Sequence, residues 1–306
     1  MTLETIYVTR HGFRSNWVVK PDGEYIASIP SPTGIPSDPA LASHGVFQAQ
    51  ELAAHLKTID PPVERFYSSP FYRCLQTINP AVEAVSLQTS DIETHKIRGE
   101  NGLGEWYGTA RFTHPNPAEP ALLKSLFDRY DENYHPVIRP NENGEGIEEL
   151  HDRTAYALHK IIERSDMEGV KTICICTHAA TLIAIGRALT GRMPENIAEE
   201  DFRPFTCSVT TFVRRRSERV EFPRSEWGGP GTAVPGISWR EGSGVGGGWG
   251  VKVNGDCSFL SGGEERGWRF SGDESFEPIQ LDAGSGLGVV IEGKKKLGHL
   301  STPSRL

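Results

Sequence analysis

Apolar and polar residues in the first two thirds of the chain follow two recurring patterns. Short runs of β-branched and aromatic residues predict buried strands, and apolar residues spaced three or four apart predict helices. Strands are predicted at residues 5–9, 65–68, 94–98, 171–177 and 209–213, and helices at 43–56, 70–85, 147–167 and 179–189. Strands that alternate with helices indicate an α/β fold with a largely parallel sheet.

Single residues set several of these boundaries. Ser43 is the expected N-cap of the first helix, because its hydroxyl can accept a bond from a free backbone N–H. Pro70 is expected to open the next helix, and Pro80 to break or bend it, because proline lacks an N–H. Residues 108–146 are rich in proline and asparagine, which predicts an insertion over one end of the sheet.

The chain changes character near residue 217. Residues 217–306 hold 20 of the 33 glycines and show little helical periodicity, which predicts an irregular glycine-rich extension after a domain at 1–216. Asn254-Gly255 and Gly262-Gly263 are turn signals that predict one or two hairpins. Large aromatic residues of the extension either fold back on the domain or dock on a partner. They are Trp227, Trp239, Trp249, Trp268 and Phe270.

Charge and cysteine content exclude several classes of protein. The net charge of -8 over 306 residues argues against a broad nucleic-acid-binding surface. No run approaches the ~20 apolar residues that cross a membrane, and the N-terminus lacks a signal-peptide pattern. We therefore expect neither membrane nor direct nucleic acid binding, and a cytoplasmic or nuclear location. The five cysteines predict a reducing compartment, with Cys174 and Cys176 packed in the core rather than on a metal.

Candidate chemistry gathers where the predicted strands end. Arg10, His11 and Arg14 follow the first strand, and open α/β sheets bind ligands at the carboxyl ends of their strands. A histidine among arginines suits a phosphate better than a metal, because arginines repel cations and bind phosphate oxygens. Arg73 lies early in a helix after another strand, where the helix N-terminus also favours anions. Each residue taken alone is equally compatible with a structural or solvated side chain.

Two further candidates are His178 and Glu105. His178 stands where a strand gives way to a helix, and it could donate to an anion there. Glu105 lies among apolar and aromatic residues in the stretch GLGEWYG at 102–108. Burial in such surroundings predicts a raised pKa for the Glu105 carboxyl, which suits a general acid.

Together these segments resemble the histidine phosphatase superfamily, which includes the cofactor-dependent phosphoglycerate mutases. The segments occur in the family's order as RHG at 10–12, SPFYRCLQT at 69–77, LGEW at 103–106 and THAA at 177–180. The resemblance covers residues 5 to about 213. It implies the phosphoglycerate mutase-like fold, a three-layer αβα sandwich with a mostly parallel central sheet.

Within this superfamily the chain looks less like the mutases. The mutase stretch after the acid is absent, and Arg14 resembles the phosphatases of the suppressor-of-T-cell-receptor-signalling type. The segments RHGFRSNW at 10–17 and PNENGE at 140–145 are most similar to the histidine-phosphatase-domain subunits of the fungal RNA polymerase III general transcription factor.

The resemblance assigns roles to the candidate residues. It implies that His11 is the nucleophile, which forms a phosphohistidine, and that Glu105 is the general acid and base. Neither a metal nor an organic cofactor is implied, because arginines supply the positive charge. The substrate would be a phosphorylated small molecule or a phosphoprotein. The implied phosphate-binding residues are Arg10, Arg14, Arg73 and His178, with Asn16 as a weaker additional donor.

Aromatic residues lie close in sequence to these positions. They either line a pocket for an aryl or apolar phosphoester, such as phosphotyrosine, or only pack around the site. They are Phe13, Trp17, Phe71, Trp106 and Tyr107.

Two functions agree with the sequence and do not exclude each other. The complete set of mechanistic residues predicts a metal-independent phosphatase that hydrolyses phosphomonoesters. The similarity to a transcription-factor subunit and the unusual extension predict a non-catalytic or weakly catalytic assembly subunit. Its phosphatase domain would then be a scaffold and its extension the docking element. A phosphoglycerate mutase is disfavoured, because the mutase stretch is missing.

Overall fold

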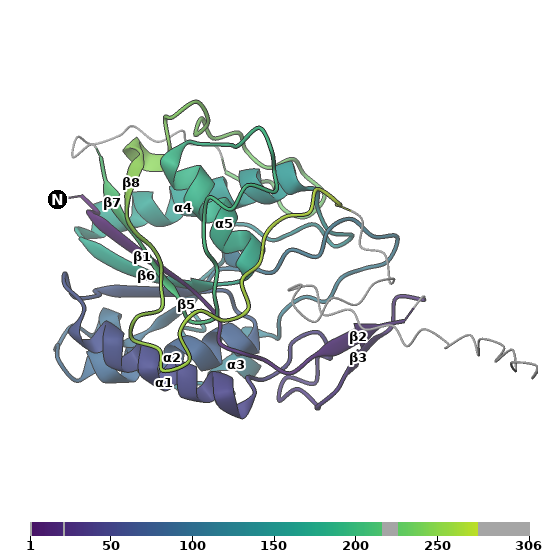
Figure 1. Cartoon of the computed structure of the whole chain (residues 1–306), viewed down its shortest axis with the longest axis horizontal. Coiled ribbons are helices and arrows are strands. Elements are labelled where there is room, and N and C mark those ends of the chain that lie inside the picture. Colours follow the sequence, from purple (N-terminus) through teal and green to yellow (C-terminus); the bar gives the residue numbers. More distant parts are fainter. Residues whose placement is uncertain (1, 21, 216–225, 275–306) are drawn as a thin grey trace, which may run out of the picture.

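A six-stranded central sheet organises the part of the chain that the computed structural model describes, which is residues 2–20, 22–215 and 226–274 (Figure 1). The sheet has the order β5-β4-β6-β1-β7-β8. Strands β5, β4, β6 and β1 run parallel to one another, whereas β7 is antiparallel to both β1 and β8. The predicted, mostly parallel α/β sheet is thus confirmed. The strands are β1 (Thr5–Arg10), β4 (Arg65–Ser68), β5 (Ile97–Gly99), β6 (Thr172–Thr177), β7 (Val209–Arg214) and β8 (Trp249–Asp256).

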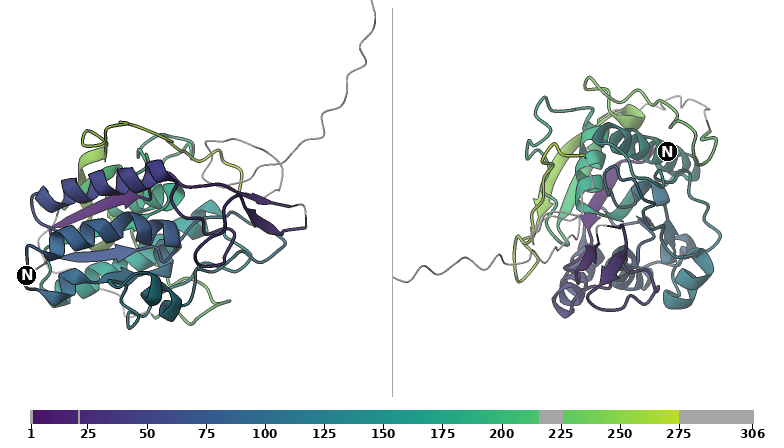
Figure 2. Two further views of the ribbon diagram at one scale, coloured as in Figure 1. Left: turned by 90° about the horizontal axis from the view of Figure 1, so that it is seen from below. Right: turned by 90° about the vertical axis from the view of Figure 1, so that its right-hand side faces the viewer.

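Helices cover both faces of the sheet (Figures 1 and 2). One face carries α1 (Ser43–Thr58), α2 (Tyr72–Ser86) and α3 (Pro120–Leu126), and the other α4 (Ile147–Glu168) and α5 (Ala179–Thr190). Alternating side chains of β1 supply both interfaces, because successive strand residues point to opposite faces. Ile6 and Val8 belong to the core under α4 and α5, and Tyr7 to the core under α1 and α2. The arrangement is the expected three-layer αβα sandwich.

Two predicted helix starts are wrong, and the break that was one alternative at Pro80 is absent. Ser43 is the first residue of α1 rather than its N-cap, and Ala42 takes the cap position without a side-chain bond. The next helix begins at Tyr72, whose N–H donates to the Asp38 carboxylate (2.9 Å), rather than at Pro70. Pro80 neither breaks nor ends α2, which continues to Ser86.

The strand predicted at 94–98 is displaced along the chain. Ile92–His95 form a 3-10 turn, and β5 follows only at Ile97–Gly99. The Asp91 carboxylate accepts a bond from the Glu93 N–H (3.0 Å), a local interaction that favours a turn over an extended strand. The Thr94 hydroxyl then donates to the Glu64 carbonyl (2.8 Å), which fixes the turn against the strand beside it.

The sequence patterns missed two short strands and one short helix. β2 (Trp17–Val19) and β3 (Tyr25–Ala27) pair antiparallel in a small separate sheet beyond the carboxyl end of β1 (Figure 1). Helix α3 lies within residues 108–146, the segment that was predicted to be an insertion. All three elements are short, so neither the strand nor the helix periodicity extends over enough residues to be recognised.

Residues 226–274 of the extension pack on the rest of the chain. β8 pairs with β7, and Trp239, Trp249 and Phe270 are each 1% exposed in the core under α4 and α5. These three aromatic residues therefore fold back on the domain, which is the first of the two predicted alternatives. The remainder of the predicted extension, at 217–225 and 275–306, lies outside the described residues.

The predicted hairpins of the extension are wrong. Asn254 and Gly255 lie inside β8, at an irregularity in its pairing with β7. Gly255 has a φ of 67°, and its N–H donates to the Thr210 hydroxyl (3.0 Å). The Asn-Gly pair thus marks a bulge in a strand rather than a turn between strands. No strand follows Gly262-Gly263 within the described residues.

All five cysteines lie in the part of the chain that the structure describes. All five cysteines are buried and free, and Cys174 and Cys176 pack in the core between β6 and the layer of α1 and α2. No helix in the described part of the chain is both long enough and apolar enough to cross a membrane.

Candidate active site

The candidate residues meet at the carboxyl ends of β1, β4 and β6. His11 follows β1, and its N–H donates to the Thr177 carbonyl at the end of β6 (2.9 Å). Ser69 follows β4, and its N–H donates to the Cys176 carbonyl (2.9 Å). His178 follows β6 and stands at the N-terminus of α5. Parallel pairing therefore brings distant sequence segments together where open α/β sheets bind ligands.

Hydrogen bonding fixes the position of the proton on the buried His11 ring. Nδ1 lies 2.9 Å from the Gly12 carbonyl oxygen, which can only accept, so Nδ1 carries the hydrogen. Nε2 is left with an available lone pair. Burial, with the charges of Arg73 and Arg10, holds the pKa of His11 well below its usual value, so the ring is neutral at pH 7. A neutral, oriented imidazole is the form that can act as a nucleophile.

Arg73, in the first turn of α2, is fully buried and connects the other site residues. Its Nη2 donates to Glu105 Oε2 (3.0 Å), and its Nη1 donates to the Ser37 carbonyl (3.2 Å) and to Asp38 Oδ1 (3.3 Å). Burial opposes the charge of Arg73, but the surrounding acids, Glu105 first, outweigh burial and raise its pKa. Its Nε is buried and has no hydrogen-bond partner among the described residues.

Arg10 and Arg14 add positive charge beside His11. Arg10 is buried, and its Nη1 donates to the carbonyls of Pro204 (2.8 Å) and Arg266. The Arg14 guanidinium lies over the Trp17 ring, 3.9 Å from its centroid. Burial lowers the pKa of Arg10 to about 10 and, with the charge of Arg73, that of Arg14 to about 9. A phosphoryl group bound here would relieve the repulsion among these cations.

The raised pKa expected for Glu105 is wrong for the ligand-free site. The carboxyl is only 6% exposed, and burial by itself would raise its pKa. Glu105 Oε2, however, lies 3.0 Å from Arg73 Nη2 and 3.2 Å from His178 Nδ1. The charges of His178 and Arg73 outweigh burial and lower the pKa of Glu105 to about 2. The carboxyl is therefore ionised at pH 7 in the free protein.

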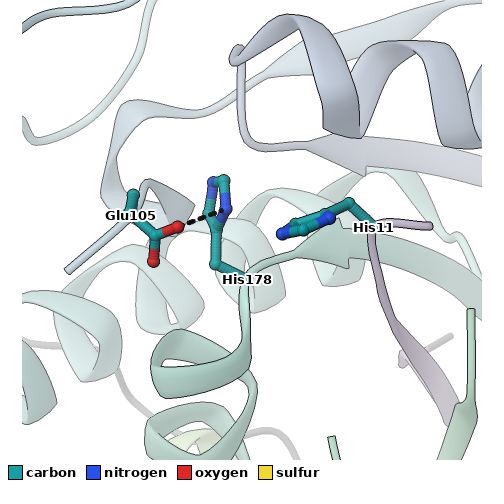
Figure 3. A group of neighbouring side chains, drawn as sticks. All are labelled: His11, Glu105 and His178. Atoms are coloured by element: carbon teal, nitrogen blue, oxygen red, sulfur yellow. Dashed lines mark ion pairs between the residues drawn. The ribbon is translucent and has the colours of Figure 1, made fainter. Parts of the chain in front are cut away.

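His178 lies between Glu105 and His11 (Figure 3). Its ring centroid is 5.3 Å from that of His11, with an interplanar angle of 64°. Nδ1 faces the Glu105 carboxylate, and Nε2 is 2.7 Å from the Ser69 hydroxyl. Burial disfavours a charged ring, but Cys74 and Glu105 outweigh it and raise the pKa of His178. The raised pKa favours the protonated form of this ring, whose positive charge would lie directly beside the His11 ring.

Two residues of the site were not singled out by the sequence patterns, and one predicted candidate lies outside the site. Asp38 and Ser69 contact Arg73 and His178 directly. Asp38 lies in a loop without any motif, and Ser69 stands inside the SPFYRCLQT stretch, which was the only signal for it. Asn16 is exposed, and no hydrogen bond joins its side chain to the other candidates in the described part of the chain.

The aromatic residues beside the site are packing residues. Four of them are at most 5% exposed and lie in hydrophobic clusters, namely Trp17, Phe71, Trp106 and Tyr107. Phe13 is half-buried, with its ring centroid 5.8 Å from that of His44. All five residues therefore pack around the site in the free protein, and three of them also line cavities, Trp106 beside His11 and Phe71 and Tyr107 beside Glu105.

The donor set also meets a distance criterion for a metal site. One donor atom each from His11, Glu105 and His178 lies within 4.8 Å of the others. The Glu105 oxygen that faces His178 is, however, already bonded to the Arg73 guanidinium, which would repel a divalent cation. The arginines beside these donors match an anion, so the residues present fit a phosphoryl group and not a metal.

Comparison with known proteins assigns the family. The profile of the histidine phosphatase superfamily (branch 1) matches residues 6–222. The chain belongs to this superfamily. The transcription factor tau 55 kDa subunit of Saccharomyces cerevisiae is 35% identical to this chain over 279 residues. The match covers 88% of this chain and 59% of that protein. The ecdysteroid-phosphate phosphatase of Drosophila melanogaster is 28% identical over 214 residues, covering 63% of this chain and 28% of that protein.

The chain therefore spans less than two thirds of either relative. The crystal structure of a Bombyx mori ecdysone phosphate phosphatase in complex with tungstate has a TM-score of 0.53 at 19% identity. The match covers 75% of this chain and 97% of that one, and it shows that the two share the histidine phosphatase fold.

A buried ion pair between Arg153 and Glu145 supports the loop that carries Glu105. Arg153 of α4 donates from Nε to both carboxylate oxygens of Glu145 (2.9 Å each) and from Nη1 to the Gly102 carbonyl (2.7 Å). The Glu145 backbone carbonyl accepts a bond from Trp106 Nε1 (2.8 Å). The residues on both sides of Glu105 are thus fixed to α4.

Arg153→Met is expected to lower the free energy of unfolding by about 3–5 kcal/mol, because it leaves the Glu145 carboxylate buried and unpaired. Urea denaturation measures this loss. Arg192→Met, which removes an exposed ion pair with Glu199, is the matched control, with an expected cost below about 1 kcal/mol. Equal losses in the two variants would contradict the structural role of the buried pair.

Proposed function

We propose that this protein is a metal-independent phosphatase that hydrolyses phosphomonoesters through a phosphohistidine on His11. The observation that carries the proposal is the state of that ring: Nδ1 donates to the Gly12 carbonyl, a lowered pKa keeps the ring neutral, and arginines surround it. Membership of the histidine phosphatase superfamily and the similarity to named phosphatases support it.

The proposed reaction has two steps. In the first, His11 Nε2 bonds to phosphorus, the bond from phosphorus to the leaving oxygen breaks, and protonated Glu105 gives its proton to that oxygen. In the second, the Glu105 carboxylate takes a proton from water as the water oxygen bonds to phosphorus and the bond to Nε2 breaks. The phosphoryl oxygens and their developing charge are stabilised throughout by Arg10, Arg14, Arg73 and His178.

Glu105 must gain a proton before the first step, because it is ionised in the free site. The bound dianionic group supplies the cause: it offsets the positive charges of Arg73 and Arg14 and adds negative charge beside the carboxylate. Both effects raise the pKa of Glu105 from its free-site value of about 2. Substrate binding therefore converts a carboxylate into a general acid.

Binding of tungstate, a tetrahedral oxyanion, is accordingly expected to take up protons, with greater uptake at pH 5.5 than at pH 7.5. Calorimetric titration in two buffers of different ionisation enthalpy measures the number of protons. Glu105→Gln is expected to take up fewer protons at pH 5.5, because the residue that gains one is gone. The same uptake in both proteins would mean that Glu105 does not change its protonation state on anion binding.

Hydrolysis of p-nitrophenyl phosphate tests the proposed function. We expect release of p-nitrophenol in the presence of a metal chelator and without any bisphosphoglycerate primer. Loss of activity with chelator and its recovery with a divalent cation would overturn the metal-independent reaction. Dependence on the primer would support a mutase instead.

A role in a transcription assembly is the second candidate, and we propose it because of the 35% identity to the tau 55 kDa subunit. The protein would then act in the nucleus and would bind other subunits. Affinity purification from a nuclear extract of its source organism, followed by mass spectrometry, tests this role by the recovery of RNA polymerase III factor subunits. A deletion variant should remove only residues 275–306, because β8 and Trp249 belong to the folded part of the chain.

A further inference from the structure

A segment of the extension crosses the candidate phosphate pocket. We call residues 264–274 the strap. In Figure 1 the yellow chain that follows β8 reaches α1 and then returns across the molecule. The strap lies beyond residues 6–222, which the superfamily profile matches, so the family's own pattern assigns nothing to it.

The strap is bonded to the site and to the elements around it. The Arg266 carbonyl accepts a bond from Arg10 Nη1, next to the proposed nucleophile. The Glu265 carboxylate lies 2.8 Å from His44 Nε2 of α1. At the other end, Glu274 Oε1 accepts a bond from the Ile147 N–H at the start of α4 (2.9 Å). Arg266 has a φ of 55°, a left-handed conformation that few residues other than glycine adopt.

The bonds of the strap hold Trp268 against a small cavity beside His11. The Trp268 side chain forms one wall of that cavity. The cavity beside His11 is lined by Arg10, Glu105, Trp106 and Trp268 and has a volume of about 10 Å³. A space of that size admits about one water molecule and no phosphoryl group. A phosphoryl group can therefore enter this cavity only after one of its walls moves.

Trp268 is the wall best placed to move. It is half-buried, whereas Trp106 on the opposite side is 3% exposed and is fixed through its Nε1 to the Glu145 carbonyl. Its ring makes T-shaped contacts with two neighbours here, with centroids 6.3 Å from Trp106 and 4.9 Å from Phe270.

Beyond Trp268 lies a second, larger space. A groove of about 1010 Å³ is lined by Trp106, Phe202, Phe205, Trp268 and Phe270, among others. Trp106 and Trp268 line both spaces, so the two are neighbours separated by these rings. Movement of the Trp268 ring would join the small phosphate pocket to a groove whose walls are partly aromatic and also carry the charged residues Glu200, Arg203, Arg269 and Asp273.

We propose that Trp268 gates the phosphate pocket and selects substrates by the group attached to phosphate. When the ring moves aside, the phosphoryl group reaches His11 and the apolar or aromatic leaving group lies in the groove. This inference rests on the proposed function, because the gated pocket is the one assigned to the phosphoryl group. Only the open fraction of molecules binds an anion, so the gate lowers the observed association rate and the affinity by that fraction.

The rate of tungstate binding tests the gate. Stopped-flow fluorescence follows binding through Trp106, which lines the pocket and is retained in every variant. Trp268→Ala is expected to raise the association rate constant by at least about tenfold and to tighten Kd. Trp268→Phe, which keeps a smaller ring and the packing on Phe270, is expected to lie between the alanine variant and the wild type. Trp227→Ala is the matched control, since Trp227 lies in the same extension but packs near Tyr156.

The outcomes separate the gate from the catalytic proposal. Equal association rates in the wild type, Trp268→Ala and Trp227→Ala would overturn the gate and leave the proposed function standing. Absence of tungstate binding in all of them, the opened variant included, would overturn both. A second readout is the substrate preference: Trp268→Ala is expected to raise kcat/KM more for a bulky naphthyl phosphate than for phenyl phosphate.

Discussion

Replacing Arg73 by methionine is expected to lower kcat/KM for an aryl phosphate by about 10³-fold or more. Arg73 is the one described residue that bonds both to Glu105 and to Asp38, and its Nε is a donor without a partner among the described residues. The variant loses that donor and releases Glu105 from its partner. It also leaves two buried carboxylates with less compensation, so we expect a loss of about 3 kcal/mol in the free energy of unfolding.

Steady-state kinetics and urea denaturation of the same preparation measure the two effects of Arg73→Met. Arg65→Met is the control, because Arg65 is the first residue of β4 and pairs with Asp91. It lies at the opposite end of this strand from the site. The control is expected to retain activity within about twofold. An active Arg73→Met enzyme, within about tenfold of the wild type, would show that this guanidinium does not contact the reacting group.

Replacing His11 by alanine is expected to have the largest effect, a loss of about 10⁴-fold or more in kcat, because the atom that receives the phosphoryl group is removed. The fold should survive, since within the described part of the chain the ring is hydrogen-bonded only to the adjacent Gly12 carbonyl. Hydrolysis of p-nitrophenyl phosphate measures the loss. His135→Ala, at an exposed position, is the control and is expected to remain fully active. Retained activity in His11→Ala would transfer the chemistry to another group.

The architecture and most of the candidate site could be predicted from the sequence, because both depend on local patterns. Strands such as 5–9 and 171–177 are short apolar runs, and parallel pairing places the residues that follow them at one edge of the sheet. His11 and His178 therefore meet as expected. Asp38 could not be found in this way, since it reaches Arg73 from a loop whose path no periodicity records.

The protonation of Glu105 and the path of the extension depend on tertiary contacts. Burial of Glu105 could be predicted from its apolar neighbours, but the cations that reverse the pKa shift come from α2 and from the end of β6. Likewise, the sequence alone predicts a turn at Asn254-Gly255, and only the pairing of β8 with β7 shows that these residues lie within a strand. The placement of Trp268 over His11 follows from the strap's bonds to Arg10 and α4, which sequence spacing does not encode.

The covalent intermediate is the most direct test of the account. Glu105→Gln is mixed with p-nitrophenyl phosphate, whose good leaving group needs little acid assistance, and is then quenched in alkali, in which phosphohistidine survives. Without the base for the second step, the phosphorylated protein should accumulate, and mass spectrometry should find one phosphoryl group on His11. Turnover by the wild type with no phosphorylation of His11 in either protein would contradict the phosphohistidine mechanism.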